Sequence, residues 1–282
     1  MSDEIKSSTS NDEIWDAAES AISTLSCAVY AAPPGACRVD ALGGYFNECQ
    51  RTVNVYSMQN PQSRSLQRVL AFLSGVLILK VTVGVVLKYH DYFPPNFESD
   101  FLSGRERYFS GIYQWAFYAH IASGPFSLIL GMILVSERFR LWFPRWHRNL
   151  GRIQVINVLC VVTPSGFWMS YYAETGLIAA TGFAMLAIAT GTCVAFGWRS
   201  AVKRQFPKHR RWMWRCFLCL SSAVVLRLIA GLTIVADIDG DWIYPMSAWV
   251  SWLAPLMAFE FVESVNRRIE KNERRPLAEN NA

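Results

Sequence analysis

The chain has 282 residues, of which 52% are apolar and 17% charged, and it carries a formal net charge of +5 at pH 7. This apolar fraction, with 11 Trp and charges gathered in blocks, exceeds that of an ordinary soluble domain and indicates a membrane protein. No basic module interleaved with aromatic residues accompanies the positive charge, which argues against nucleic acid as a partner.

Residues 1–65 are predicted to form a cytoplasmic N-terminal extension. They begin with Ser, Asp and Glu and lack the basic leader and apolar core of a cleavable signal. Asp12 to Ala31 has a helical apolar stripe that ends at Pro33, and an irregular linker follows. We expect this helix to rest on the rest of the protein, and binding to a membrane or a partner stays an open alternative.

Six apolar stretches follow, each close to the ~20 residues that a helix needs to cross a bilayer. These predicted spans are Leu66 to Leu87, Ile112 to Val135, Ile153 to Tyr172, Leu177 to Trp198, Cys216 to Ala236 and Trp242 to Val262. The pattern predicts an all-α, polytopic membrane helix bundle over residues 66–264, whose central helices form a four-helix core of two similar hairpins.

Lys and Arg are concentrated in every second connection. Ser136 to Arg152, Arg199 to Arg215 and the tail of residues 265–282 are basic, whereas Ala173 to Gly176 and Ala236 to Asp241 carry only acidic charges. The positive-inside rule then predicts a multi-pass inner-membrane protein with both termini in the cytoplasm. The same basic residues are expected to contact anionic lipid headgroups.

Three basic side chains fall inside the predicted spans, where charges are rare and usually functional. Counted at about 1.5 Å per residue, Lys80, His120 and Arg227 all lie in the outer third of the membrane. Such a layer suits an anionic group: a haem propionate, a lipid phosphate or a deprotonated quinone. For Lys80 we favour snorkelling to the surface. Arg227 is predicted either to bind such a group or to pair with Asp237, Glu174 or backbone carbonyls.

His120 is followed by Ser123, Gly124 and Pro125. Proline has no amide hydrogen, so Pro125 is expected to free the carbonyl of Ile121, while the small residues allow a close neighbour. Two interpretations stay open for His120: a hydrogen bond across helices, or ligation of a metal or haem.

Two connections contain nearly the same sequence, from Phe143 to Arg148 and from Phe206 to Arg211. If the helices that follow are neighbours, His147 and His209 can face each other and ligate a haem iron or one metal ion. Four arginines would lie near enough to hold propionates, namely Arg148, Arg152, Arg211 and Arg215. The alternative is that these residues bind lipid phosphates and fix the topology.

The His-Arg and Arg-Trp-Met elements around His147 and His209, together with His120, Gly124, Gly131 and Arg227, resemble a bacterial membrane family known as domain of unknown function 2306. The resemblance covers about Ile112 to Arg227, is expected to continue to Phe261, and implies a multi-helix inner-membrane protein without an established activity. The extension before Ser65 departs from the usual pattern.

A more distant similarity is to di-haem cytochrome b electron carriers, whose central four helices each supply a histidine. His120, His147 and His209 would match the second, third and fifth helices. The fourth helix has no histidine, although Met185 lies at about the depth of His120. This resemblance implies haem b as the cofactor and leaves its outer site incomplete.

Three functions follow as hypotheses. The first is transmembrane electron transfer linked to a b-type haem or a quinone, with His147 and His209 as inner ligands and His120 with Arg227 as an outer polar site. The second is a transporter or lipid-handling protein that binds an anionic solute at His120 and Arg227, in helices interrupted by proline. The third is a non-catalytic membrane scaffold. The sequence does not decide whether the protein is an enzyme.

Overall fold

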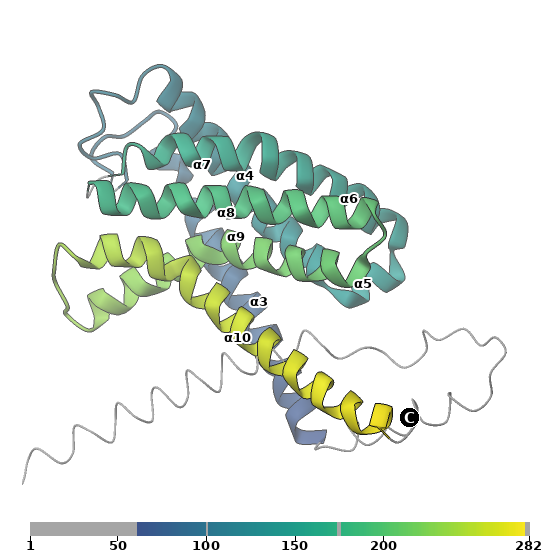
Figure 1. Cartoon of the computed structure of the whole chain (residues 1–282). Helices are drawn as coiled ribbons and strands as arrows, with labels where there is room; N and C mark the ends of the chain where they lie inside the picture. Colours follow the sequence, from purple (N-terminus) through teal and green to yellow (C-terminus); the bar gives the residue numbers. More distant parts are fainter. Residues whose placement is uncertain (1–60, 100, 174–175, 280–282) are drawn as a thin grey trace, which may run out of the picture. The chain divides into compact units, whose positions relative to one another are not determined.

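The computed structural model describes residues 61–99, 101–173 and 176–279, so the predicted N-terminal helix lies outside the described residues. Within these ranges the chain is helical and contains no strand, which confirms the all-α prediction (Figure 1). The elements are α3 (Pro61–Leu87), η1 (Lys88–Asp91), α4 (Ile112–Val135), α5 (Glu137–Trp142), α6 (Pro144–Asn157), η2 (Val158–Val162), α7 (Thr163–Ser170), α8 (Leu177–Val202), α9 (Phe206–Val235) and α10 (Ile243–Glu279).

Five helical stretches in the described ranges are long and apolar enough to cross a membrane. They are Val69–Asp91, Ile112–Val135, Pro144–Ser170, Leu177–Val202 and Phe206–Val235. The sixth predicted span, Trp242 to Val262, falls on α10, which is helical but is not among the five. A polytopic bundle is therefore confirmed, and whether α10 crosses the membrane stays a prediction.

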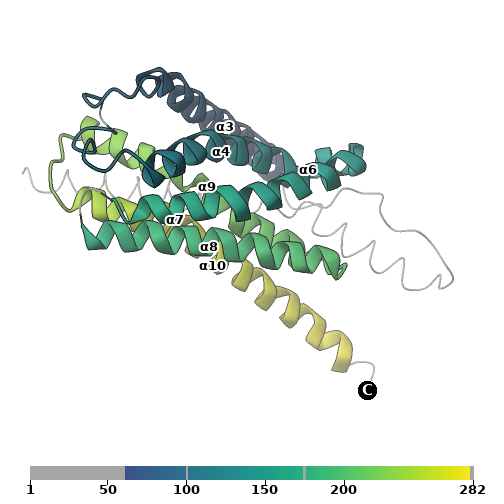
Figure 2. The same ribbon diagram turned by 90° about the horizontal axis from the view of Figure 1, so that it is seen from above.

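Residues 77–257 form one compact unit, and its centre is a closed ring of four helical segments. The continuous segment of α6, η2 and α7 packs against α4 on one side and α8 on the other, and α9 also packs against both α4 and α8 (Figure 2). The predicted four-helix core is thus present. The third and fifth predicted spans lie diagonally across it, so the assumption that they are neighbours is wrong.

Two of these helices begin earlier than their apolar stretches. α6 begins at Pro144 and α9 at Phe206, each with a proline in the first turn, where the missing amide hydrogen costs nothing. His147 and His209 consequently lie on helices, close to their N-terminal ends. We call this end of the bundle, with α5, the C-terminal turn of α8 and the first turns of α6 and α9, the basic end.

Polar contacts and a close glycine contact fix the packing. On α6, Gln154 Nε2 donates to the carbonyl of Ser127 at 3.0 Å, and Asn157 Nδ2 donates to the hydroxyl of Ser127 at 2.6 Å. Between α7 and α8, a Cβ atom added at Gly191 would lie 3.0 Å from Cγ2 of Thr163. Small residues of this kind let membrane helices approach closely.

At the other end of the bundle lies an irregular segment of residues 92–99 and 101–111, which we call the cap segment. Its Leu102 and Phe109 are buried with Tyr113 and Phe117 of α4 in one cluster. Arg105 is 5% exposed and fastens the segment by donating to Tyr113 Oη at 3.1 Å and to the carbonyl of Tyr172 at 3.3 Å.

The described residues outside this unit are 61–76 of α3 and 258–279 of α10. In the first of these stretches, Phe72 and Leu73 are among several exposed apolar side chains. In the second, Arg267 Nε donates to the backbone carbonyl of Glu263 at 3.2 Å.

Candidate functional site

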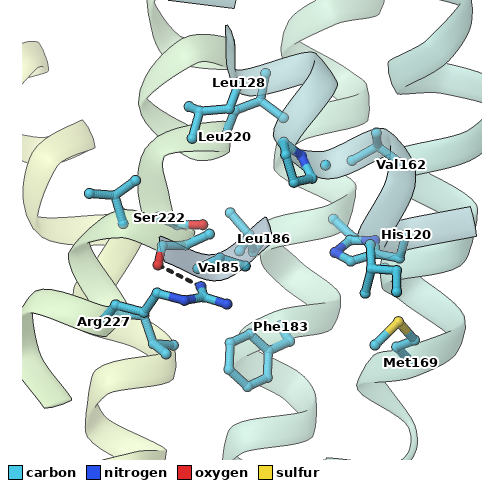
Figure 3. A pocket seen from close by; sticks show the side chains of 18 of the residues that line it. Val85, His120, Leu128, Val162, Met169, Phe183, Leu186, Leu220, Ser222 and Arg227 are labelled. Atoms are coloured by element: carbon cyan, nitrogen blue, oxygen red, sulfur yellow. Dashed lines mark hydrogen bonds between the residues drawn. The ribbon is translucent and has the colours of Figure 1, made fainter. Parts of the chain in front are cut away.

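A cavity of about 490 Å³ lies within the unit of residues 77–257, between the cap segment and the middle of the bundle. The second half of α3 covers it with Val81, Thr82 and Val85, and every helix of the four-helix core contributes to its walls. Most of the lining side chains are apolar. His120 and Arg227, which sequence counting placed in one layer, both line this cavity (Figure 3).

Arg227 projects from α9 into the cavity, and its Nη1 donates to the carbonyl of Ala223 at 2.9 Å (Figure 3). Among the described residues no carboxylate forms an ion pair with it, so Asp237 is not its partner, and the other predicted partner, Glu174, lies outside the described residues. The titratable groups that interact electrostatically with Arg227 are Tyr89 and Tyr92, whose hydroxyls are neutral at pH 7. The guanidinium charge therefore lacks a counter-charge in this part of the structure.

The direction of the Arg227 side chain separates two explanations. The residue lies about two turns before the end of α9 at Val235, and a snorkelling arginine would extend toward that end. Instead the guanidinium turns back by one turn to Ala223, toward the middle of the bundle. This geometry keeps the charge inside the predicted span.

His120 lies on α4 and is held by the segment that contains η2 and α7. Its Nδ1 is 3.1 Å from the hydroxyl of Ser165, and the carbonyl of Val162 also interacts with the imidazole. A Cβ atom added at Gly166 would lie 3.1 Å from Cε1 of His120, so this glycine makes room for the ring. The predicted hydrogen bond across helices is confirmed, and His120 still faces the cavity.

Pro125 predicted that the carbonyl of Ile121 lacks its helical hydrogen bond, but it did not predict which group donates to this carbonyl instead. Tyr89, in the short η1 helix, donates to this carbonyl at 2.7 Å and also lines the cavity. Sequence reasoning missed Tyr89, Tyr92 and Arg105 because they lie between spans. The dense run of aromatic residues from Tyr89 to Tyr118 was the signal that a structured interfacial segment lies there.

Two residues named from sequence lie outside the cavity lining. Lys80 is exposed on α3, so the expected layer of three cations contains only His120 and Arg227 at the cavity. Met185 is 45% exposed on α8 and does not line the cavity. Met185 therefore does not supply the second ligand that the outer haem site lacks, and this site stays incomplete.

The two histidines of the repeated motif lie at the basic end. His209 Nδ1 is 2.9 Å from the carbonyl of Gly197, and His147 lies within electrostatic range of His209 although their helices are diagonal. His147 Nδ1 is buried and has no hydrogen-bond partner among the residues that the structure describes. No group of three or more His, Cys, Asp or Glu among the described residues is arranged to hold a metal ion. A shared ligand at His147 and His209 stays a prediction.

The four arginines predicted beside these histidines lie on α6 and α9. Arg148 and Arg152 are exposed on α6, and Arg211 is half-buried on α9. The guanidinium of Arg215 lies 4.6 Å from the centre of the Trp212 ring. The neighbouring Arg210 pairs with Glu137, which joins α9 to α5.

The model of a family described as predicted membrane protein, DUF2306, matches residues 117–262, so this chain belongs to that family. The match includes His120 and Arg227 and excludes α3, η1 and the cap segment. No curated protein and no solved structure matches the chain. The resemblance to di-haem cytochrome b carriers is not supported by these comparisons.

Proposed function

We propose that this DUF2306 protein binds a small amphipathic anion in the cavity between α3, α4, α7, α8 and α9, and acts as a lipid-handling or transport protein of the membrane. One observation carries the proposal: Arg227 points into an apolar cavity without a counter-charge among the described residues. A charge within a span is costly when it is unpaired, and an anionic ligand removes that cost.

The other walls suit the same ligand. Aliphatic side chains such as Val85 and Leu186 offer contact to a hydrocarbon group, and His120 with Tyr89 offers hydrogen bonds near its polar end. The cavity volume, about 490 Å³, is in the range of pockets that hold one small organic molecule. Among the earlier hypotheses, we favour binding of an anion over haem-linked electron transfer, because Arg227 and the apolar walls suit an anionic amphiphile and the comparisons do not support the resemblance to di-haem cytochrome b carriers.

The test compares ligands that share a dodecyl chain and differ in their head. Thermal unfolding of the purified protein in detergent is measured with laurate, dodecyl phosphate, dodecanol and dodecylamine. A ligand that binds only the folded state raises the unfolding temperature. We expect stabilisation by the two anions and little by the alcohol or the amine, because only the anions neutralise Arg227.

Variants assign the effect to Arg227. Arg227→Gln removes the charge, and loss of a charge-assisted hydrogen bond worth about 1.5–3 kcal/mol weakens anion binding by ten- to about a hundredfold. Arg227→Lys should restore binding only in part, because an ammonium lacks the planar fork of donors. Lys80→Gln is the matched control, since Lys80 is also a cation on a predicted span but lies outside the cavity. Equal stabilisation by dodecanol would refute the proposal.

A further inference from the structure

We propose that the ligand enters this cavity sideways from the bilayer, past Ala223 and Arg227 of α9, and is therefore a single-chain lipid-like anion that partitions into the membrane. This inference rests on the proposed function and adds the route and the ligand class. It follows from two observations on the unit of residues 77–257: packed side chains close the cavity toward both ends of the bundle, and the exposed residues of the cavity lining lie on one helix.

The end of the bundle under the cap segment is closed by packed aromatic side chains. Leu102 and Phe117 are fully buried there, and Tyr113 is 2% exposed. The Phe101 and Phe117 rings are stacked with their centroids 5.4 Å apart, and both residues line the cavity. Arg105 lies 4.4 Å from the centre of the Phe101 ring and ties the segment to Tyr113 of α4 and to Tyr172, just after α7. The described side chains of the cap segment thus pack closely over this end of the cavity.

Toward the basic end the bundle is closed by a second cluster. Val158 and Val194 are fully buried, and Cys193 and Cys216 pack with them. Leu220 packs against this cluster and also lines the cavity, so the cluster forms the floor of the cavity on that side. A water-soluble ion from the basic end would have to cross this packed layer.

The exposed part of the lining is on one helix. Among the described residues that line the cavity, only Ala223 and Arg227 are exposed, and they are one turn apart on α9. Leu228 and Leu232 on the same helix are 40% and 69% exposed. Because exposed apolar side chains on a membrane span face hydrocarbon, the accessible edge of the cavity faces lipid.

The size of the cavity fixes how much of the ligand it can hold. About 490 Å³ accommodates a head group and part of one chain, in the range of pockets for small organic ligands. The anionic head would contact Arg227 at the edge and His120 further in, and the rest of the chain would extend past Ala223 into the bilayer. A fatty acid or a single-chain phosphate ester has this chemistry.

The experiment follows the entry of a stearate that carries a fluorophore at mid-chain, delivered in vesicles to the protein in nanodiscs, with energy transfer from tryptophan as the signal. Ala223→Phe narrows the proposed opening without adding a tryptophan. Ala230→Phe is the matched control, because Ala230 is also exposed on α9 but does not line the cavity. We expect Ala223→Phe to slow association and dissociation alike, each by about tenfold, which corresponds to a barrier raised by about 1.4 kcal/mol.

The association and dissociation rates together distinguish a narrowed entrance from a cavity that the new side chain fills. An obstructed entrance slows both rates and leaves Kd unchanged, whereas a phenylalanine that fills the cavity speeds release and raises Kd. Ala223→Val provides a smaller change in case the phenylalanine prevents folding.

Unchanged rates in both Ala223 variants, or a raised Kd with faster release, would each overturn lateral entry. If stearate binds and Arg227→Gln abolishes its binding, the proposed function survives this failure. If no anionic amphiphile binds the wild-type protein, the proposed function itself fails.

Discussion

The hydroxyl of Tyr89 donates a 2.7 Å hydrogen bond to the carbonyl of Ile121, the carbonyl that Pro125 leaves without its helical partner. One proline in α4 thus creates the acceptor that holds the short helix after α3. The bond lies beside the cavity, because both Tyr89 and Ile121 line it.

Tyr89→Phe should lower the stability of the folded protein by about 1 kcal/mol, because the Ile121 carbonyl then lacks a partner. In a Pro125→Ala background, the substituted alanine supplies an amide hydrogen to the same carbonyl, and Tyr89→Phe should then cost much less. The difference is a coupling free energy from a double-mutant cycle of thermal unfolding. Equal costs in the two backgrounds would show that the bond does not depend on the proline.

Asn157→Ala should destabilise the contact between α6 and α4 by about 0.6–2 kcal/mol, the range for hydrogen bonds between membrane helices. The side chain loses its 2.6 Å bond to the hydroxyl of Ser127. Asn149→Ala is the control, since Asn149 is exposed on the same helix. Thermal unfolding in detergent measures both variants, and similar losses would mean that the bond to Ser127 contributes little.

Gly191→Leu should destabilise the protein by about 1–3 kcal/mol through overpacking between α7 and α8. A Cβ atom at this position meets Cγ2 of Thr163 at 3.0 Å, whereas one at Gly151 meets nothing within 4 Å. Gly151→Leu is therefore the matched control. The double variant Gly191→Ala with Thr163→Ala should be more stable than Gly191→Ala alone, because the contact with Thr163 is removed. If it is not, the strain does not come from the contact between Gly191 and Thr163.

The positive-inside pattern makes the orientation testable. Reporter fusions after Arg204 should report the cytoplasm and fusions after Asp239 the opposite side, because the two positions flank α9, a candidate span. A fusion after Asn272 then decides whether α10 crosses: a cytoplasmic signal there requires six spans. The reverse pattern at Arg204 and Asp239 would discard the orientation.

The apolar stretches located the helices of the core because lipid requires long uninterrupted runs. They placed the starts of α6 and α9 too late, since the basic first turns, with His147 and His209, carry no apolar signal although a proline opens each helix. Counting along helices placed His120 and Arg227 at one depth, and both line the cavity. Counting could not reveal the cap segment, because its burial depends on contacts between aromatic residues distant in sequence, such as Tyr108 and Tyr172.

The short π-helix from Val158 to Val162 determines in which direction around the helix axis the side chains of α7 point. Asn157 and Ser165 both contact α4, through Ser127 and His120. In an uninterrupted α-helix, positions eight apart differ by about 80° around the axis. The π-helical turn contains one extra residue, so the two positions differ by only about 20° around the axis, in the opposite sense. Both side chains therefore point to α4. The extra residue thus sets the rotation of everything that follows, and the orientation of Ser165 and Gly166 toward His120 depends on keeping it.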